Sequence, residues 1–514
     1  MISKINSSGI IGIDGFAVTV ECSAWDRIPK FDLVGLADTA VKEAKNRVYS
    51  ACENSGFTFP SLDIMINLAP ADIKKEGSSY DLAIITAILQ CNRIIPSQTE
   101  LSDCCIIGEL SLSGEVRPVN GILSMVIAAR DSGLKRVFVP LGNLAEASMV
   151  KGITVYGVST LRRLVEHLKG TSFIEPTPCA VGTLDLTGRV NSPDFREVRG
   201  QLRAKRALEI AAAGGHNVLM IGPPGAGKSM LAKRIPSILP DMDFEEALQT
   251  TKIHSVTGNL RSAFVTERPF RSPHHTVSPA GMIGGGTKPR PGEISLANNG
   301  VLFLDELPEF PKNVTESLRQ PLEDGRVTVT RASGKVTYPS RFMLVCAMNP
   351  CKCGFFGSPD KQCTCPAGSV NKYLERVSGP LLDRIDIQIE LPAVSYEDIS
   401  GSTPEGEPSA AIRERVNKSR SFTNRRLESK GDAPGILNSQ MSRDMMVRHC
   451  TLEPEASQLM KNAFEMLGLS ARGYDRVIKV ARTIADLDGS EIINADHITE
   501  AIYYRSLDRK YWKR

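Results

Sequence analysis

The stretch that decides the fold reads Gly222-Pro-Pro-Gly-Ala-Gly-Lys-Ser229. It follows an apolar run at 217–221 and precedes a run at 230–235 with helical spacing. A strand, a glycine-rich turn and the start of a helix form the context of a phosphate-binding loop. Glycines allow successive backbone N–H groups to converge on a phosphate, and the helix N-terminus adds partial positive charge. The segment therefore predicts a nucleotide-binding protein.

Two side chains of this loop have predicted roles of their own. We expect the Lys228 ammonium to bind the β- and γ-phosphates of ATP and the Ser229 hydroxyl to bind Mg²⁺. The other expected contacts come from the rest of the loop, namely Gly222, Pro223, Pro224, Gly225, Ala226 and Gly227. A glycine-rich turn before an ordinary helix is the alternative, and the agreement of strand, turn and Lys-Ser pair disfavours it.

Two further apolar runs end in polar side chains, as buried parallel strands do at a ligand site. The run 301–304 is followed by Asp305 and Glu306. We expect Asp305 to hold Mg²⁺ through water and Glu306 to polarise the water that attacks the γ-phosphate. The run 342–345 leads to Asn349, which can orient the same water. Solvated acids after a core strand and an ordinary Asn-Pro turn are the alternatives, but the series favours a doubly wound α/β core.

Composition narrows the class of protein. The chain has 514 residues, 41% of them hydrophobic and 23% charged, which is typical of a soluble globular protein with about three domains. A net charge of +4 does not by itself imply a polyanionic partner. The sequence has no signal-peptide pattern and no apolar run of membrane-spanning length, and 12 cysteines in this context favour reduced thiols or metal. We therefore expect a cytoplasmic protein without a membrane partner.

The chain divides into five expected segments. Alternating strands at 16–21 and 63–68, with helices at 39–54 and 82–89, indicate an α+β domain at the start. The segments are this domain at 1–170, a Pro-, Thr- and Gly-rich linker at 171–195, the nucleotide-binding core at 196–393, a polar, mobile connection around one charged helix at 394–440, and a helical lid at 441–514.

The order of the motifs resembles a known family. The phosphate loop, the two polar strand ends, Leu381-Leu-Asp-Arg384 and Ser470-Ala-Arg472 resemble AAA+ ATPases of the Mg-chelatase/MCM branch. Over essentially the full chain, the sequence resembles the bacterial ComM/YifB group of Mg-chelatase-like proteins. The resemblance implies that Arg384 is an arginine finger acting in a neighbouring subunit's site and that Arg472 is the sensor arginine of the lid. It therefore implies a ring, hexameric as in relatives; without it, both arginines would be ordinary surface residues.

Two segments look like insertions into the core. The first, at 270–293, carries three consecutive glycines with Lys288 and Arg290, and the second, at 325–339, has β-rich arms whose turn is bracketed by Arg331 and Lys335. In the related branch such hairpins point into the central channel, so the resemblance implies that these cations contact single-stranded, forked or branched DNA. It further implies ATP-driven helicase or branch-migration activity in homologous recombination and natural transformation, with recombination proteins as further partners. Solvated basic turns are the alternative.

Four cysteines form a compact cluster in the sequence. Cys351 and Cys353 are followed by Cys363 and Cys365 within fifteen residues, and four thiolates match a closed tetrahedral Zn²⁺ site. The C-x-C spacing is tighter than the usual C-x-x-C, and free reduced thiols are the alternative. We expect structural zinc that braces the loop beyond Asn349.

The first domain resembles another enzyme class. The segment 75–82 is similar to the serine loop of Lon-type proteases, with Ser79 at or near the nucleophile position, and 108–129 is similar to the segment with their catalytic lysine. Leu123 stands at that lysine position, and a serine without its base is not activated. We expect a Lon-like fold, related to domain 2 of ribosomal protein S5, without peptidase activity.

Two other functions share parts of this pattern. A chelatase subunit that drives Mg²⁺ or Co²⁺ into a tetrapyrrole has most of the ATPase motifs, but a Lon-like first domain is not expected in it. An ATP-dependent protease or protein remodeller is disfavoured by Leu123. DNA stimulation of ATP hydrolysis distinguishes the motor from both.

Overall fold

The computed structural model describes residues 2–180, 193–260, 262–286, 289–331, 334–359, 361–394 and 406–512. Contacts group the chain into two compact units. The first unit comprises Met1–Asp185 with Phe244–Val265, and the second comprises Leu186–Asp243 with Thr266–Arg514. Within the described ranges, no helix combines the length and the apolar character needed to cross a membrane.

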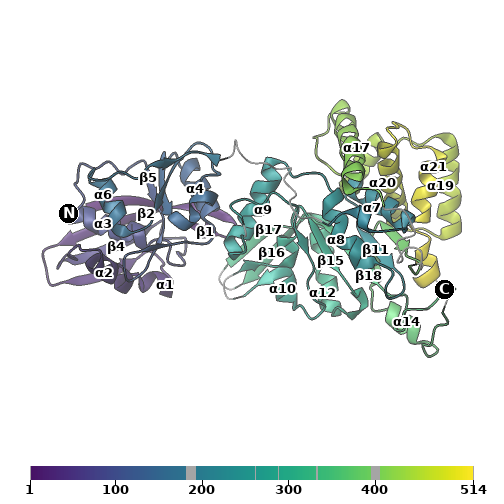
Figure 1. Cartoon of the computed structure of the whole chain (residues 1–514), viewed down its shortest axis with the longest axis horizontal. Coiled ribbons are helices and arrows are strands. Elements are labelled where there is room, and N and C mark those ends of the chain that lie inside the picture. Colours follow the sequence, from purple (N-terminus) through teal and green to yellow (C-terminus); the bar gives the residue numbers. More distant parts are fainter. Residues whose placement is uncertain are drawn as a thin grey trace. The chain divides into compact units, whose positions relative to one another are not determined.

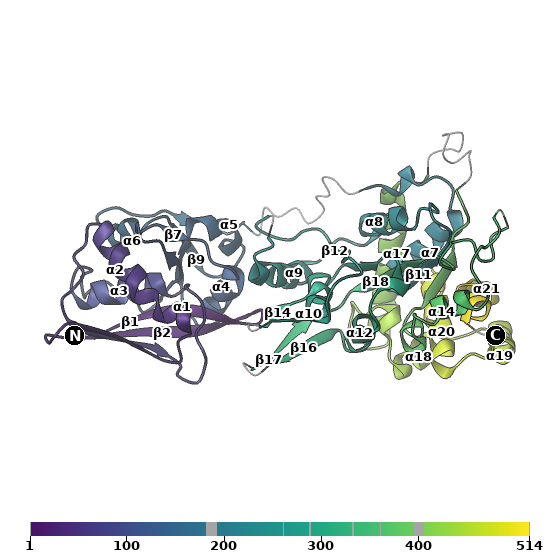
Figure 2. The same ribbon diagram turned by 90° about the horizontal axis from the view of Figure 1, so that it is seen from below.

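The first unit is built on an eight-stranded sheet with the strand order β10-β9-β8-β5-β1-β2-β4-β3. The predicted strands appear as β2 (Asp14–Trp25) and β4 (Asp63–Ala69), and the predicted helices as α1 (Thr39–Lys42) with α2 (Ala44–Asn54) and as α3 (Asp81–Cys91). The remaining main elements are β1 (Ile2–Ile11), β3 (Lys30–Val34), β5 (Cys104–Ile106), β8 (Arg136–Pro140), β9 (Thr154–Val158), β10 (Pro176–Thr177), α4 (Ile122–Asp131) and α6 (Leu161–Leu168). Helices α3 and α4 pack on the β1–β2 hairpin (Figure 2). The predicted mixed α/β architecture is confirmed.

One helix of this unit comes from far along the chain. Helix α9 (Phe244–Thr257) follows α8 (Lys228–Ile238), the helix after the phosphate loop, in sequence, yet it packs against α4. There the buried Ser255 hydroxyl donates to the buried Glu146 carboxylate. The predicted core at 196–393 included this helix, so the observed division of the chain differs from the predicted boundaries. Helical spacing predicts a helix but does not say which unit its buried face will join.

The second unit contains a five-stranded parallel sheet with the order β12-β15-β18-β11-β19. Figure 1 labels its three central strands, β15, β18 and β11. The strands are β12 (Phe270–Arg271), β15 (Val301–Leu304), β18 (Met343–Met348), β11 (Val218–Ile221) and β19 (Ile387–Glu390). All residues of β11, β15 and β18 are buried, which explains their continuous apolar runs. Because the strands are parallel, the loops that follow β15, β18 and β11 emerge side by side at one edge.

Helices complete this unit. Those that precede or follow the strands of the core sheet in sequence are α7 (Leu202–Gly214), α8 (Lys228–Ile238), α10 (Pro279–Ile283), α11 (Glu293–Leu296), α12 (Lys312–Ser317), α13 (Arg319–Asp324), α14 (Ser369–Leu374) and α15 (Gly379–Leu382). The lid helices are α18 (Arg443–His449), α19 (Pro454–Leu467), α20 (Ala471–Leu487) and α21 (Ala495–Tyr503). Figure 1 shows α17 (Ser409–Ser429) beside α7 and α20, and contacts between these helices agree.

Helix α17 lies in the segment predicted as a mobile connection. Its Ile412, Val416 and Leu427 are buried in the same apolar cluster as Val477 and Ile484 of the lid. The described part of this segment is therefore structural, and α17 joins the lid to the core. Most residues of α17 are polar or charged and only a narrow stripe is apolar, so its composition indicated a mobile connection.

Candidate nucleotide site and four-thiol cluster

The phosphate loop connects β11 to α8. Gly225 and Gly227 have φ values of 79° and 85°, which favour glycine, and a Cβ atom on either would meet no atom within 4 Å. At Gly222, by contrast, a Cβ atom would lie 2.7 Å from the Leu391 carbonyl oxygen. Helix α8 begins without a side-chain cap, so its first N–H groups are available to phosphate oxygens. The loop has the open shape and the donors that a phosphate requires.

Lys228 and Asn349 meet at this loop. The Lys228 ammonium donates to the carbonyl oxygens of Gly222 at 2.7 Å and Pro223 at 2.9 Å, and to Oδ1 of Asn349 at 3.0 Å. Burial lowers the pKa of Lys228, while the negative charge of Asp305 opposes this shift. The structure thus brings together two predicted residues that lie 121 positions apart in sequence.

The expected Mg²⁺ ligands also lie together. The Ser229 hydroxyl donates to Oδ2 of Asp305 at 2.6 Å, so a hydroxyl and a carboxylate lie side by side next to the phosphate loop. Oxygen ligands of this kind fit Mg²⁺, which binds few protein groups and keeps several waters. Glu306 follows in a left-handed conformation (φ 52°), and its side chain is 61% exposed. Its carboxylate is accessible to solvent, as a group that polarises water must be.

One residue near Glu306, His275, was not predicted from the sequence. The Nδ1 atom of His275 lies 3.7 Å from Oε2 of Glu306, and its ring lies 4.0 Å from that of His274. His275 belongs to the loop after β12, which pairs in parallel with β15. The two adjacent histidines were the only sign of this site in the sequence. That His275 approaches Glu306 depends on β12 lying beside β15, and the order of the strands in the sheet could not be predicted from the sequence.

Arg384 lies at the opposite edge of the sheet. Its backbone carbonyl accepts a hydrogen bond from Nδ2 of Asn217 at 2.8 Å, and Asn217 immediately precedes β11. The phosphate loop follows β11, which has four residues and so spans about 13 Å at a rise of about 3.3 Å per residue. The guanidinium contacts Glu323 and donates to the Arg319 carbonyl at 3.2 Å. These contacts keep the Arg384 side chain only 10% exposed.

Arg472 is exposed in the first turn of α20. Arg476, one turn later on the same helix face, donates to the carbonyl oxygens of Leu382 at 3.5 Å and Ile385 at 3.3 Å. This contact places the start of α20 close to Arg384. The two predicted arginines therefore occupy one neighbourhood of the second unit.

The two predicted hairpins are observed in the second unit. The first pairs β13 (Gly284–Gly285) with β14 (Arg290–Pro291), and the second pairs β16 (Arg326–Arg331) with β17 (Gly334–Pro339). The Tyr338 hydroxyl of β17 donates to the Pro289 carbonyl of the first hairpin at 2.8 Å, so the hairpins are in contact.

The structure describes the side chains of two of the four cations predicted to contact DNA. Arg290 and Lys335 are exposed. Lys288 lies outside the described residues, and so does the side chain of Arg331.

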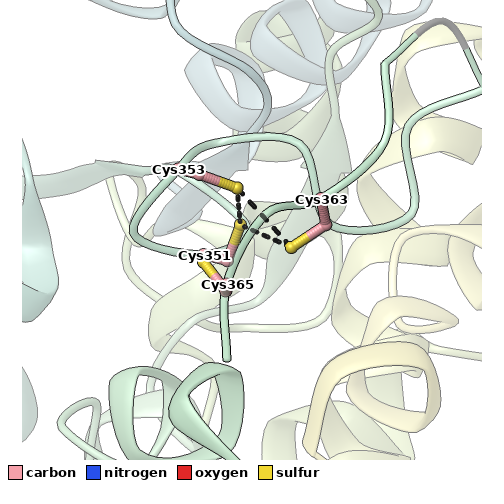
Figure 3. Close-up of side chains that lie close together, drawn as sticks. All are labelled: Cys351, Cys353, Cys363 and Cys365. Carbon is pink, nitrogen blue, oxygen red and sulfur yellow. Dashed lines mark hydrogen bonds between the residues drawn. The ribbon is translucent and has the colours of Figure 1, made fainter. Parts of the chain in front are cut away.

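The four cysteines meet in one loop after β18 (Figure 3). The Cys351 sulfur lies 3.3 Å from that of Cys353 and 3.7 Å from that of Cys363, and all four sulfurs lie within 4.8 Å of one another. A zinc tetrahedron with Zn–S bonds of about 2.3 Å has sulfur–sulfur edges of about 3.8 Å. Backbone N–H groups, chiefly that of Phe355, hold the pKa of the Cys353 thiol below its usual value, whereas burial raises the pKa of the Cys351 thiol. The fit to zinc therefore rests on the ligand type and on the distances between the sulfurs. The donor set fits zinc.

The Lon-like residues of the first unit do not form a recognisable catalytic pair. Ser79 is buried, and the neighbouring Ser78 hydroxyl donates to the Glu109 carboxylate. Leu123 is fully buried in α4. An aliphatic side chain cannot act as the base that a serine nucleophile needs.

Comparison with known proteins agrees with the geometry. The family model described as "Magnesium chelatase, subunit ChlI" matches residues 194–399. The model "Subunit ChlI of Mg-chelatase" matches residues 20–143, and the model "Magnesium chelatase, subunit ChlI C-terminal" matches residues 406–505. The chain is 41% identical over 511 residues to YifB of Escherichia coli, covering 99% of this chain and 98% of that protein. It is 40% identical to the competence protein ComM of Haemophilus influenzae, covering 98% and 97%, respectively. It is also 31% identical over 150 residues to the Lon protease of Neorickettsia sennetsu, covering 28% and 17%. The chain belongs to the ComM/YifB type of Mg-chelatase-like AAA+ ATPases.

Proposed function

We propose that this protein is a ring-forming, hexameric motor that couples ATP hydrolysis to movement along DNA. Its substrates are single-stranded, forked or branched DNA, and its task is helicase or branch-migration activity in homologous recombination. The name of the Haemophilus influenzae relative, a competence protein, supports a role in natural transformation.

The hydrolysis chemistry follows from the residues at the sheet edge. Lys228 would bind the β- and γ-phosphates of ATP, and Ser229 with Asp305 would hold Mg²⁺, which supplies positive charge beside the phosphates. Glu306 would polarise the attacking water, and Asn349, 3.0 Å from the Lys228 ammonium, would orient that water.

The position of Arg384 supports sites shared between subunits. Arg384 lies just before the start of β19, and its own phosphate loop lies at the other end of the neighbouring strand β11, about 13 Å away. Its guanidinium would therefore leave Glu323 and meet the γ-phosphate of an adjacent copy. Arg472 lies in the same neighbourhood and would serve the same boundary. Hydrolysis would then depend on a neighbour, as a ring motor requires.

The joined hairpins carry the DNA part of the proposal. One hairpin precedes the strand of Glu306 and the other follows it, and the Tyr338–Pro289 hydrogen bond links them. Exposed Arg290 and Lys335 offer two cations per subunit to a phosphate backbone. A ring repeats these cations in every subunit, which makes weak individual contacts effective and sensitive to salt.

We also propose that the four-thiol loop holds one structural Zn²⁺. The convergence of Cys351, Cys353, Cys363 and Cys365 supports this assignment. Zinc would fix the loop immediately beyond Asn349, whose amide contacts Lys228.

The experiment is a steady-state ATPase assay with forked and single-stranded DNA. Wild type should be stimulated several-fold, the effect should disappear after nuclease digestion of the DNA, and Lys228→Ala should be inactive throughout. An ATPase rate that is unchanged by any DNA, or stimulation that survives nuclease treatment, overturns the DNA motor.

A further inference from the structure

The four-thiol loop forms a wall of the phosphate loop. Gly354, the residue after Cys353, lies so close to Pro224 that a Cβ atom on Gly354 would be 2.3 Å from Cδ and 2.8 Å from Cγ of the proline ring. Real Cβ atoms do not approach other heavy atoms this closely. The backbone of the thiol loop is therefore packed directly on the Pro224 ring of the turn that would receive the nucleotide phosphates.

Hydrogen bonds to Cys351 hold the turn that contains Gly354. The Gly354 N–H donates to the Cys351 carbonyl at 3.0 Å, and the Phe356 N–H donates to the Cys351 sulfur at 3.3 Å. Gly354 thus lies inside a tight turn that starts at Cys351 and is closed by the hydrogen bond from Phe356 to the Cys351 sulfur. Figure 3 shows that sulfur together with those of Cys353, Cys363 and Cys365. A metal bound by the four sulfurs would fix this turn, and loss of the metal would free it.

The opposite side of the loop is supported as well. The Phe356 ring lies 6.4 Å from the Tyr511 ring, and the Tyr511 hydroxyl donates to Glu390 at 2.7 Å. Glu390 ends β19, and the next residue, Leu391, donates its N–H to the Ile221 carbonyl at 2.7 Å, just before the phosphate loop. The thiol loop consequently lies between the phosphate loop, which follows β11, and the segment around Tyr511, which is connected to the end of β11 through Glu390 and Leu391.

We propose that metal binding at the four-thiol loop and nucleotide binding at the phosphate loop are coupled through the Gly354–Pro224 contact. The inference rests on the metal proposed above. The filled thiol loop acts as a fixed wall that holds Pro224, and hence the phosphate loop, in its nucleotide-binding conformation. Coupling between two binding sites is reciprocal, so bound nucleotide must also retain the metal. The thiol loop thereby makes the ATPase responsive to zinc supply and to reagents that remove zinc.

Two neighbouring glycines provide a matched pair of variants. Gly354 and Gly357 both have left-handed backbones, with φ values of 88° and 75°, so alanine introduces similar backbone strain at either position. A Cβ atom at Gly357 would lie 3.7 Å from the flexible end of Lys510, which is an ordinary contact. Gly354→Ala therefore disturbs the wall, whereas Gly357→Ala controls for backbone strain in the same loop.

The test measures metal and nucleotide separately. Zinc content of the purified full chain is determined by mass spectrometry, zinc release to a chromogenic chelator is followed with and without ADP, and affinity is measured with fluorescent mant-ADP. We expect one zinc per chain and at least fivefold slower release with ADP in wild type and Gly357→Ala. Gly354→Ala should keep its zinc, bind mant-ADP about tenfold more weakly, and lose the protection by ADP.

The outcomes separate the two proposals. Absence of stoichiometric zinc overturns the metal site itself. One zinc per chain whose release is the same with and without ADP in wild type overturns the coupling, and this measurement depends on no variant. Wild-type mant-ADP affinity in a zinc-loaded Gly354→Ala protein also overturns it.

Discussion

Replacing Asp486 by asparagine should destabilise the ATPase unit, because this carboxylate forms ion pairs with two buried arginines. Asp486 and Arg482 have fully buried side chains, and that of Arg426 is 6% exposed. The Asp486 carboxylate lies 2.9 Å from each guanidinium and also accepts hydrogen bonds from Thr423 at 2.8 Å and Asn438 at 2.7 Å. These contacts join α20 to α17, so one acid connects the lid to the helix that packs against α7.

The magnitude follows from the burial of the charges. Removing one partner of a buried ion pair costs about 3–5 kcal/mol, since the other charge is left without compensation. Asparagine has nearly the same volume as aspartate, so no cavity contributes. At about 2–4 °C per kcal/mol for a large domain, the melting temperature of the ATPase unit should fall by about 6–20 °C.

The assay is thermal denaturation followed by calorimetry, with Glu414→Gln as the control. Glu414 pairs with Lys418 on the same α17, but these side chains are 66% and 73% exposed. The control should melt like wild type, because exposed pairs contribute little. An Asp486→Asn protein that melts within 2 °C of wild type would refute the reasoning.

Three other changes test separate parts of the molecule. Glu306→Gln should retain ATP binding in a filter assay while hydrolysis falls by about 10²–10⁴-fold, the usual contribution of a group that activates water; unchanged hydrolysis would exclude that role. Lys335→Ala should weaken DNA binding equally for all sequences and reduce the salt dependence of binding by about 0.7 per lost contact with a single strand, as fluorescence anisotropy at several salt concentrations would reveal. Leu427→Ala should destabilise the unit by about 2–5 kcal/mol in urea denaturation, because this α17 side chain is fully buried; no change would mean that α17 is not part of the core.

The sequence was most informative where chemistry coincides with the ends of strands. Lys228, Asp305 and Asn349 could be placed together in advance, because parallel strands deliver their polar ends to one edge and each motif has a fixed spacing. The proximity of the four cysteines was also predictable, since they lie within fifteen residues. Short-range patterns therefore specify both the nucleotide edge and the sulfur cluster.

Contacts between distant segments could not be predicted in the same way. The approach of His275 to Glu306 depends on β12 lying beside β15, and the contact of Gly354 with Pro224 depends on β18 lying beside β11. Helix α9 joins the first unit through tertiary packing that its own spacing does not encode. Such features require the strand order and the packing of whole helices, which local periodicity does not determine.

The central claim, that neighbouring copies share each nucleotide site, is tested most directly by mixing two inactive variants. Lys228→Ala loses its own phosphate contact but keeps Arg384, whereas Arg384→Ala keeps an intact phosphate loop but lacks the arginine that would serve a neighbour. Each variant alone should be inactive, and Arg384→Ala should still bind ATP. Mixed in the presence of DNA, the two should form rings in which some boundaries are complete, and ATP hydrolysis should reappear. A mixture as inactive as its components, or full hydrolysis by a strictly monomeric wild-type preparation, would contradict the account.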